Sequence, residues 1–416
     1  MTTNDWIEQA VTTAVAAVAD ELDAFSRDLH AHPEVGFREF RSVRAIGDLL
    51  ARHGLDLETG VGGIPTAFRS RIGSSQGPQV VVTAEYDALP GVGHGCGHNV
   101  IAASSIGAFL ALAPLVADGR LPGGVTLLGT PAEEGGGGKE LLIQAGAFDG
   151  FDASVMIHPG AVDAAAVVAN AKRQVVATFT GATAHAAANP HLGRNALDAA
   201  VTAYQAIAQL RQHIVDTDRV HGVFLEAGTR PNIVPERAVL EFFLRSRSVD
   251  SLLALSRRVE NAFRGAALAA DVEVDVAWDT EPIYLPHRLN RVLAERFSER
   301  SAPRRSVVVA VEDTGQPAGS TDVGNVSQLL PTIQPIVAIG APDIPGHSRE
   351  RADSTLTPDG RRAILDSATA LALTAADVLV DDDLRAAAWA EFRAAGEPVR
   401  VGDLVPLAPW PTFPTE

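Results

Sequence analysis

The chain has 416 residues, with 34 Lys and Arg against 51 Asp and Glu, so its formal net charge is −17. An acidic chain of this kind repels phosphate backbones and anionic lipid surfaces, which argues against nucleic-acid binding and against a polybasic membrane anchor. The single cysteine, Cys96, excludes a scaffold held by intrachain disulfides and favours a cytoplasmic location. Because 46% of the residues are hydrophobic, the chain can bury sizeable cores, and its length predicts two or three domains.

The first and last parts of the chain alternate strands with helices. Nearly continuous apolar runs predict buried strands at residues 79–84, 123–128, 153–157 and 333–339. The segments with helical character are 40–52, 98–117, 138–146, 322–330 and 358–380. This alternation indicates an α/β fold, in which helices cover both faces of a mostly parallel sheet.

The uncharged segment 99–117 is interpreted as a buried helix, because small and polar residues interrupt it too often for a membrane span. Acidic residues near the N-terminus, Asp5 and Glu8, argue against an export signal.

The middle of the chain has a different order of elements. Strands are predicted at residues 172–180, 220–226, 238–245 and 272–278, with helices at 195–213 and 249–268. The resulting order, βαββαβ, is typical of a ferredoxin-like α+β domain. We therefore expect an inserted domain at residues 171–287 and a discontinuous catalytic domain made of residues 1–170 and 288–416.

Residue types that bind metals follow each predicted strand of the α/β part. They are Glu85, Asp87, His94, Cys96 and His98 after the first strand, Glu133 and Glu134 after the second, His158 after the third, and His347 after the fourth. Ligands of open α/β sheets bind beyond the carboxyl ends of the strands, so these side chains are expected to converge. The glycines that flank Cys96 allow a thiolate and an imidazole to approach one ion. Of two neighbouring carboxylates, one can coordinate a metal while the other holds a proton.

The sequence does not match the residue spacing of other known site motifs. The glycine run 135–138 is not a P-loop, because no Ser or Thr follows Lys139, and the glycines at 91, 93 and 95 miss the dinucleotide pattern. No His-Glu-x-x-His helix occurs in the sequence.

Six segments together carry a family resemblance. They are Glu85-Tyr-Asp-Ala-Leu-Pro, His94-Gly-Cys-Gly-His-Asn, Pro131-Ala-Glu-Glu-Gly, Gly181-Ala-Thr-Ala-His185, Asn232-Ile-Val-Pro and Ser320-Thr-Asp-Val-Gly-Asn. They resemble the dinuclear metallopeptidase-like amidohydrolases, a family that includes aminoacylases, carboxypeptidase G, hippurate hydrolase and the plant auxin-conjugate hydrolases. The sequences of these segments most resemble the branch of p-aminobenzoyl-glutamate hydrolase and β-alanyl-lysine dipeptidase. The resemblance implies a zinc-exopeptidase-like catalytic domain and an inserted lid that also serves dimerisation.

The resemblance also implies roles for individual residues. Two divalent ions, zinc or manganese, would be held by Cys96, His98, Glu134, His158 and His347. Glu133 would be the general base, and Asp87 would orient a ligand imidazole by accepting its other N–H. Much of the family has a histidine where Glu85 stands, but the branch with the Cys-x-His motif lacks that histidine too. Glu85 is therefore left without a role, and His94 is left outside the ligand set.

Residues of the inserted domain complete the implied site. His185 matches a position that stabilises the oxyanion, commonly across a homodimer, and Asn232 and Arg245 match positions that contact the substrate's carboxylate. The implied reaction is hydrolysis of an amide bond in an N-acyl amino acid or dipeptide-like small molecule. The alternative is a non-catalytic, ligand-binding member of the same fold. Dipeptidase, aminoacylase, aryl-glutamate hydrolase and N-carbamoyl hydrolase activities stay open.

Overall fold

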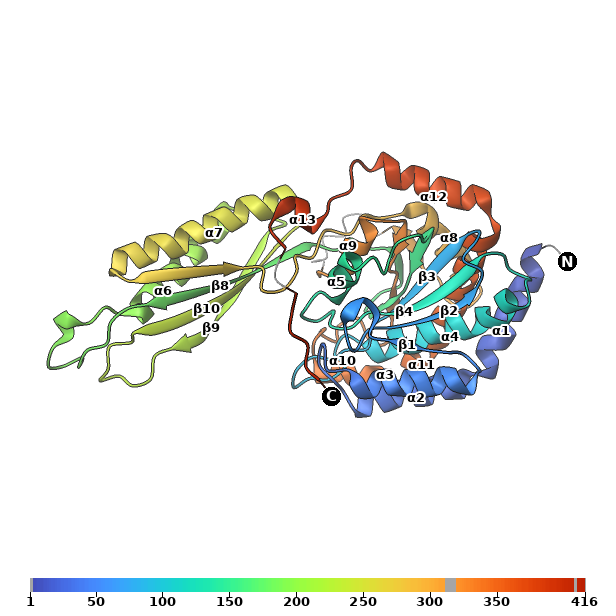
Figure 1. The fold of residues 1–416 in the computed structure, drawn as a ribbon, viewed down its shortest axis with the longest axis horizontal. Coiled ribbons are helices and arrows are strands. Elements are labelled where there is room, and N and C mark those ends of the chain that lie inside the picture. The colour runs from blue at the N-terminus through green and yellow to red at the C-terminus, as the bar shows by residue number, and fades with distance from the viewer. Residues whose placement is uncertain (1–2, 311–318, 408–409, 416) are drawn as a thin grey trace.

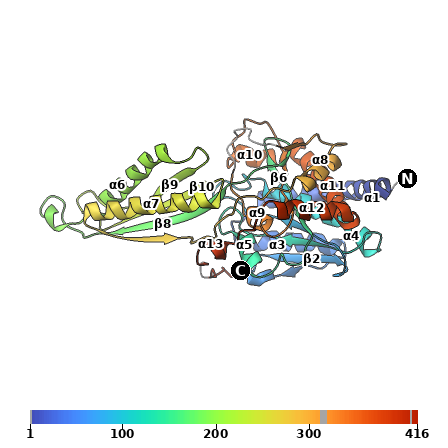
Figure 2. The ribbon, with the colours of Figure 1, turned by 90° about the horizontal axis from the view of Figure 1, so that it is seen from above.

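A computed structural model describes residues 3–310, 319–407 and 410–415 of the chain. Within them, one part holds a six-stranded sheet surrounded by helices, and an antiparallel sheet with two helices extends from it (Figures 1 and 2). The six-stranded sheet has the order β1-β2-β4-β3-β5-β13. Its strands are β1 (Glu58–Thr59), β2 (Phe68–Gly73), β4 (Gly124–Gly129), β3 (Gln79–Ala84), β5 (Ala153–Val155) and β13 (Thr332–Ile333). Strands β4, β3, β5 and β13 run parallel, and β1 and β2 form an antiparallel edge, which confirms the predicted mostly parallel α/β sheet.

The central strand β3 is buried on both faces, as its uninterrupted apolar run predicts. Val80 and Val82 belong to the main hydrophobic core, whereas Val81 belongs to a second core on the other face. Helices contributing to the main core include α1 (Thr3–Ala17), α2 (Ala19–Ala31), α3 (Phe40–Arg52), α4 (His98–Ala117), α8 (Arg291–Ser301), α11 (Pro358–Val380) and α12 (Asp382–Ala394). The second core includes residues of α5 (Gly138–Gln144) and α9 (Val323–Ser327). The sheet therefore has helices on both faces.

Two helices, α4 and α11, are long and apolar enough to cross a membrane by length and composition alone. In the structure, 89% and 83% of their most apolar windows are buried. They pack against each other in the main core, so their composition is explained by their position inside the protein.

One predicted strand, 333–339, is wrong as a single element. It divides into β13 in the central sheet and β14 (Ile336–Ala338) in a second sheet, ordered β12-β7-β14-β6. The other strands of this second sheet are β12 (Val308–Ala310), β7 (Ala164–Ala166) and β6 (His158–Gly160). The break falls at Pro335, which has no N–H to donate to a strand partner, while its carbonyl accepts a bond from the His158 amide.

The inserted part has the predicted βαββαβ order. It consists of β8 (Ala171–Thr180), α6 (Ala196–Leu210), β9 (Arg219–Ala227), β10 (Arg237–Ser246), α7 (Val249–Ala270) and β11 (Glu273–Trp278). The strands form a fully antiparallel sheet, β11-β8-β10-β9, and inward residues of β10, such as Leu240 and Phe242, share a core with both helices. Asn195 and Ser248 cap the two helices by accepting bonds from backbone N–H groups. The boundaries 170/171 and 287/288 between domains stay a prediction.

Candidate metal centre

The loop between β3 and α4 brings Cys96 and His98 to the carboxyl end of the central sheet. Gly97 lies between them in the left-handed conformation, with φ of 76°, and directly precedes helix α4. A side chain at this position would be strained, so the glycine permits the sharp turn from the thiol to the imidazole. Cys96 is partly exposed, whereas His98 is buried at the first position of the helix.

The imidazole of His98 is oriented by a carboxylate. Its Nδ1 lies 2.9 Å from Asp87 Oδ1, and the second Asp87 oxygen accepts a bond from the Glu134 amide at 3.0 Å. Burial lowers the pKa of His98, but the carboxylates of Asp87, Glu85 and Glu134 raise it well above the ordinary value. Its Nε2 lies 3.4 Å from Glu85 Oε2, and both atoms are buried without a hydrogen-bond partner within the described chain. The geometry gives Asp87 the orienting position that the sequence predicts.

Glu133 and Glu134 stand on the loop between β4 and α5. The loop is shaped by Ala132, whose φ is 58°, and whose amide donates to the buried carboxylate of Glu39 at 2.9 Å. The Tyr284 hydroxyl donates to the Glu133 carbonyl at 2.6 Å. Burial, and then the carboxylates of Glu85 and Glu134, raise the pKa of Glu133 well above its ordinary value. A carboxyl group in this position is suited to hold a proton.

His158 and His347 are the two remaining predicted donors, and they come from other parts of the chain. His158 begins β6, and its Nδ1 lies 2.7 Å from the Pro159 carbonyl, so Nδ1 donates and Nε2 keeps a free lone pair. Burial lowers the pKa of His158 to about 4, so this imidazole is neutral near pH 7 and suited to bind a cation. His347 is exposed in a left-handed conformation, with φ of 57°, and its Nε2 lies 3.9 Å from Glu134 Oε2.

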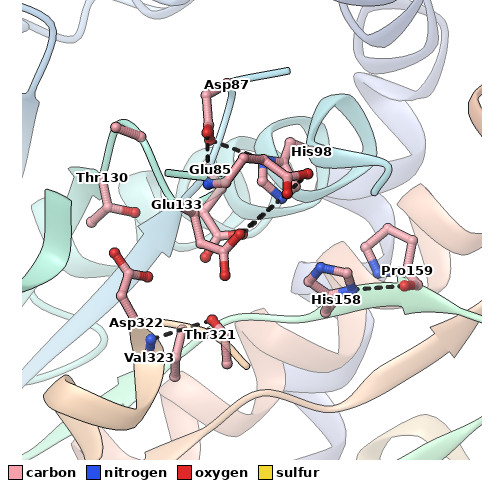
Figure 3. Close-up of polar contacts among 12 residues, drawn as sticks. Glu85, Asp87, His98, Thr130, Glu133, His158, Pro159, Thr321, Asp322 and Val323 are labelled. Atoms are coloured by element: carbon pink, nitrogen blue, oxygen red, sulfur yellow. Dashed lines mark hydrogen bonds and ion pairs between the residues drawn. The ribbon is translucent and has the colours of Figure 1, made fainter. Parts of the chain in front are cut away.

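Three groups of donor atoms have the spacing of a metal site. In each group, one donor atom per residue lies within 4.8 Å of the others. The groups are Cys96 with His98 and His158, Cys96 with Glu134 and His347, and Glu85 with His98 and Glu133. The first two contain all five predicted ligands and share the thiol. Figure 3 shows Glu85, His98 and Glu133 close to one another, and a dashed line joins Asp87 to the imidazole of His98.

The chemistry of these donors fits divalent cations. Burial, followed by the nearby carboxylates of Glu134 and Glu133, raises the pKa of the Cys96 thiol well above its ordinary value. A thiolate can exist beside these carboxylates only if positive charge compensates it. Thiolate, imidazole and carboxylate together form a donor set that zinc commonly uses. The unpartnered Nε2 of His98 and Oε2 of Glu85 supply two further buried atoms that a cation would satisfy.

A buried ion-pair cluster beside these donors was not predicted from the sequence. Lys139 donates through Nζ to Glu85 Oε1 and to Asp322 Oδ1, both at 2.6 Å, and all three side chains are fully buried. The Lys139 amide also donates to Asp322. Lys139 follows the glycine run and Asp322 lies in one of the segments that carry the family resemblance, but nothing in their spacing shows that they meet.

His94 lies outside all three donor groups. It is buried, and burial lowers its pKa to about 3, so it is neutral in the folded protein. The structure therefore offers no reason to add it to the predicted ligands.

The donors lie at one side of a cleft of about 660 Å³. Cys96, Glu133, Glu134, His158 and His347 line it together with Arg245 of the inserted sheet. His185 and Asn232 are not among the lining residues. Both are exposed and lie beside each other, where His185 bridges to Ile233 and the Asn232 carbonyl accepts from the Ala186 amide.

The position of His185 follows from the direction of β8. Lys172, near the start of this strand, lines the cleft, and His185 follows its far end at Thr180. A strand advances about 3.3 Å per residue, so the end of β8 lies roughly 25–30 Å from its start. The structure thus brings Arg245 to the donors and leaves His185 and Asn232 away from them within the same chain.

An α/β sheet whose strand ends gather thiol, imidazole and carboxylate donors defines a candidate metal-dependent hydrolase. The model of peptidase family M20/M25/M40 matches residues 81–368. The mouse Xaa-Arg dipeptidase (Mus musculus) is 36% identical over 402 residues, covering 93% of this chain and 92% of the relative. A subunit of the p-aminobenzoyl-glutamate hydrolase of Escherichia coli K12 is 27% identical, covering 91% of this chain and 93% of the relative.

Solved structures show the same fold. The YXEP protein of Bacillus subtilis, described as a dinuclear metal binding peptidase from the M20 family, matches with a TM-score of 0.64 and 22% identity. The match covers 88% of this chain and 99% of that one. The chain belongs to peptidase family M20/M25/M40, which confirms the family resemblance found in the sequence.

Proposed function

We propose that this protein is a metal-dependent amidohydrolase that cleaves an amide bond in an N-acyl amino acid or dipeptide-like small molecule. The observation that carries the proposal is the set of donor atoms within 4.8 Å of one another beside the buried carboxylate of Glu133. Cys96, His98, Glu134, His158 and His347 would hold two divalent ions, zinc or manganese. When bound, such ions polarise a carbonyl group and lower the pKa of water.

Glu133 would carry the proton in this reaction. Burial and the carboxylates of Glu85 and Glu134 raise its pKa, which favours a protonated carboxyl group, and bound cations would lower that pKa. The bond from Tyr284 to the Glu133 carbonyl holds the backbone of this residue at the cleft. Glu133 would take a proton from the attacking water and deliver it to the departing amine, so one group serves both steps.

Arg245 supports an amino-acid substrate. Its guanidinium is half-buried on the cleft wall, where it can receive the carboxylate of the released amino acid. The relatives are named as a dipeptidase and a hydrolase of an aryl-amino acid conjugate, and both substrates join a carboxylate-bearing amino acid through an amide. The acyl side of the substrate would lie toward Leu89, Val167 and Ile336, which also line the cleft.

Metal dependence tests the proposal directly. Purified protein should contain two equivalents of divalent metal by elemental analysis, hydrolyse members of a panel of N-acyl amino acids and dipeptides, and lose both on chelation. Glu133→Gln should keep the metal and lose at least 10³-fold in kcat, because the proton carrier is removed while the donors remain. Glu299→Gln, a change at an acid that is 71% exposed and outside the donor set, is the control and should retain turnover. A metal-loaded wild type that hydrolyses nothing in the panel would contradict the enzyme assignment.

The inserted domain would serve as a lid and as the dimerisation domain. Strand β9 is an edge strand of the antiparallel sheet, and Val223 and Leu225 on it are 54% and 57% exposed. An apolar edge strand favours pairing with a second copy. The long separation between His185 and the donors of its own chain supports a role for His185 in the site of the other subunit.

A mixing experiment tests this arrangement. Glu133→Gln and His185→Ala proteins should each be inactive, and their mixture should recover up to about a quarter of wild-type activity if mixed dimers form with one intact site. Analytical ultracentrifugation should give a dimer mass. A monomer with full activity, or no recovery from verified mixed dimers, would contradict action across an interface.

A further inference from the structure

Tyr284 connects the inserted sheet to the loop that carries Glu133. It is buried in the segment that leads from β11 back to the part with the six-stranded sheet. Its amide donates to the Lys172 carbonyl at 3.0 Å, and its carbonyl accepts from the Lys172 amide at 2.9 Å. Lys172 in turn is directly opposite Arg245 on β10. Arg245, Lys172 and Tyr284 therefore form one row across neighbouring extended segments.

The side chains of this row reach from the cleft wall to Glu133. Directly opposite residues of antiparallel strands lie on the same face, and all three side chains line the cleft together with Glu133. The Lys172 ammonium lies 3.9 Å from the centre of the Tyr284 ring, and the Tyr284 hydroxyl donates to the Glu133 carbonyl at 2.6 Å. Burial, and then the carboxylates of Asp322 and Glu133, raise the pKa of Tyr284 well above its ordinary value, so the hydroxyl keeps its proton and remains a donor.

The bond to Glu133 differs in origin from the bonds that hold the residues on either side of it. The Ala132 amide donates to Glu39 at 2.9 Å, and the Glu134 amide donates to Asp87 at 3.0 Å. Glu39 directly precedes α3 and Asp87 follows β3, so both acceptors belong to the part with the six-stranded sheet. The backbone of Glu133, by contrast, is bonded to the row that begins in the inserted sheet.

Asn325 of α9 holds the backbone on both sides of Tyr284. Its Oδ1 accepts from the Leu285 amide at 2.8 Å, and its Nδ2 donates to the Ile283 carbonyl at 2.9 Å. The same Nδ2 donates to Glu140 Oε2 at 2.7 Å, which ties this segment to α5, the helix that follows the catalytic loop. The tyrosine ring therefore leaves a fixed backbone, and its hydroxyl has a defined place relative to the loop.

We propose that Tyr284 is a positioning residue that fixes the distance between Glu133 and Arg245, and that this distance selects α-amino acids over β-amino acids on the amine side of the substrate. The inference rests on the proposed function, in which Glu133 protonates the departing amine and Arg245 binds the carboxylate. In an α-amino acid one carbon separates these two groups, and in a β-amino acid two carbons do. Proton transfer requires hydrogen-bond reach, and a misplacement of about 1 Å can cost about 100-fold in rate.

Isomeric substrates test the inference. N-benzoyl-L-alanine and N-benzoyl-β-alanine have the same atoms and charge and differ in the distance from the amide nitrogen to the carboxylate. Metal-loaded wild type should show a kcat/KM at least tenfold higher for the L-alanine compound. Tyr284→Phe keeps the ring but removes the bond to Glu133, so it should lower this isomer ratio at least threefold. For the L-alanine compound, kcat should fall at least tenfold while KM stays within about threefold, because Arg245 still binds the carboxylate.

Two further variants locate the effect. Tyr86→Phe is the matched control, because Tyr86 is also fully buried and its hydroxyl also donates to a backbone carbonyl, that of Thr66, outside the row. It should leave the isomer ratio unchanged, as should any change that only lowers the fraction of folded protein. Lys172→Met removes the ammonium from the Tyr284 ring but keeps the backbone bonds of the row. It should lower the ratio at least twofold, and it carries the test if Tyr284→Phe does not fold.

Hydrogen exchange separates this inference from the proposed function, because it needs no turnover. In metal-loaded protein, the backbone amides of residues 132–137 should exchange at least fivefold faster in Tyr284→Phe than in the wild type, and at the wild-type rate in Tyr86→Phe. Faster exchange in a protein that hydrolyses nothing would refute the proposed function and keep the positioning of Glu133 by Tyr284. Turnover with unchanged exchange, with a wild-type isomer ratio near one, or with the same ratio in Tyr284→Phe would overturn the inference and keep the proposed function.

Discussion

Replacing Lys139 by methionine should destabilise this protein far more than any exposed charge change. Methionine fits the space of the aliphatic stem but removes the ammonium group that bonds Glu85 and Asp322. Burial lowers the pKa of Lys139, but Asp322 and Glu85 raise it above the ordinary value of 10.5. A raised lysine pKa means that this stabilisation is fully present below pH 10.5 and is lost only as pH rises through the folded pKa. Measurements near pH 7 therefore see the full effect.

The magnitude follows from the geometry. Both carboxylates are fully buried and each lies 2.6 Å from Nζ, so the substitution leaves two close acids without a cation. Removing one partner of a buried ion pair costs about 3–5 kcal/mol. Asp322→Asn in the Lys139→Met background should recover part of that loss, because it removes the repulsion between the two remaining carboxylates.

Urea unfolding of the chelated protein measures this effect, because chelation removes any contribution from bound cations. The wild type, Lys139→Met, Asp322→Asn and the double variant form a thermodynamic cycle. Arg264→Gln is the control, since Arg264 is 60% exposed in its pair with Glu260, and its loss should be below about 1 kcal/mol. A Lys139→Met protein within about 1 kcal/mol of wild type, or a double variant less stable than the sum of the single losses, would refute the reasoning.

Three further changes test other parts of the structure. Cys96→Ala should lose at least one equivalent of metal and the thermal stabilisation that metal provides, and unchanged stoichiometry by elemental analysis would contradict the assignment of Cys96 as a ligand. Burial raises the pKa of Glu39 to about 8, so the wild type should lose stability relative to Glu39→Gln as pH rises from about 5 to about 8, and parallel denaturation curves across that range would argue against it. Gly138→Ala places a Cβ 1.9 Å from the Pro131 carbonyl oxygen and should lower kcat/KM at least tenfold by displacing the catalytic loop, whereas Gly265→Ala, with open space around it, should leave kcat/KM unchanged.

The alternation of strands and helices could be predicted from the sequence because its cause is local. Helices α4 and α11 have the predicted bounds, and the βαββαβ order of the inserted part is as expected. The strand predicted at 333–339 failed because hydrophobicity does not show that Pro335 passes the chain from one sheet to another. Helix α12 was missed since it packs mainly through Leu384, Ala388 and Phe392, too short a pattern to stand out.

The convergence of Cys96 and His98 with Glu133 and Glu134 was also predictable, because β3 and β4 run parallel and end at the same edge of the central sheet. The residues that pair with those donors or hold their loops could not be predicted from the sequence. Lys139 and Asp322 are 183 residues apart in the sequence, and Glu39 and Ala132 are 93 residues apart. Only tertiary packing brings the members of each pair together. The face to which Arg219 and Arg245 point follows from strand register, which depends on the pairing of β9 with β10 and not on either strand alone.

The charged groups in and beside the cleft differ in what compensates their charge. Lys139 compensates Glu85 and Asp322 permanently, inside the protein, where solvent does not reach. Glu133 and Glu134 have no lysine or arginine ion-pair partner among the described residues, and the His98 imidazole lies 3.8 and 3.9 Å from them. Bound metal would compensate these carboxylates and the Cys96 thiol further. Arg245 of the inserted sheet lines the same cleft and would be compensated by a substrate carboxylate under the proposed function. Under the proposed function, this cleft would orient an acyl amino acid with its amide toward the metal donors and its carboxylate toward the inserted sheet.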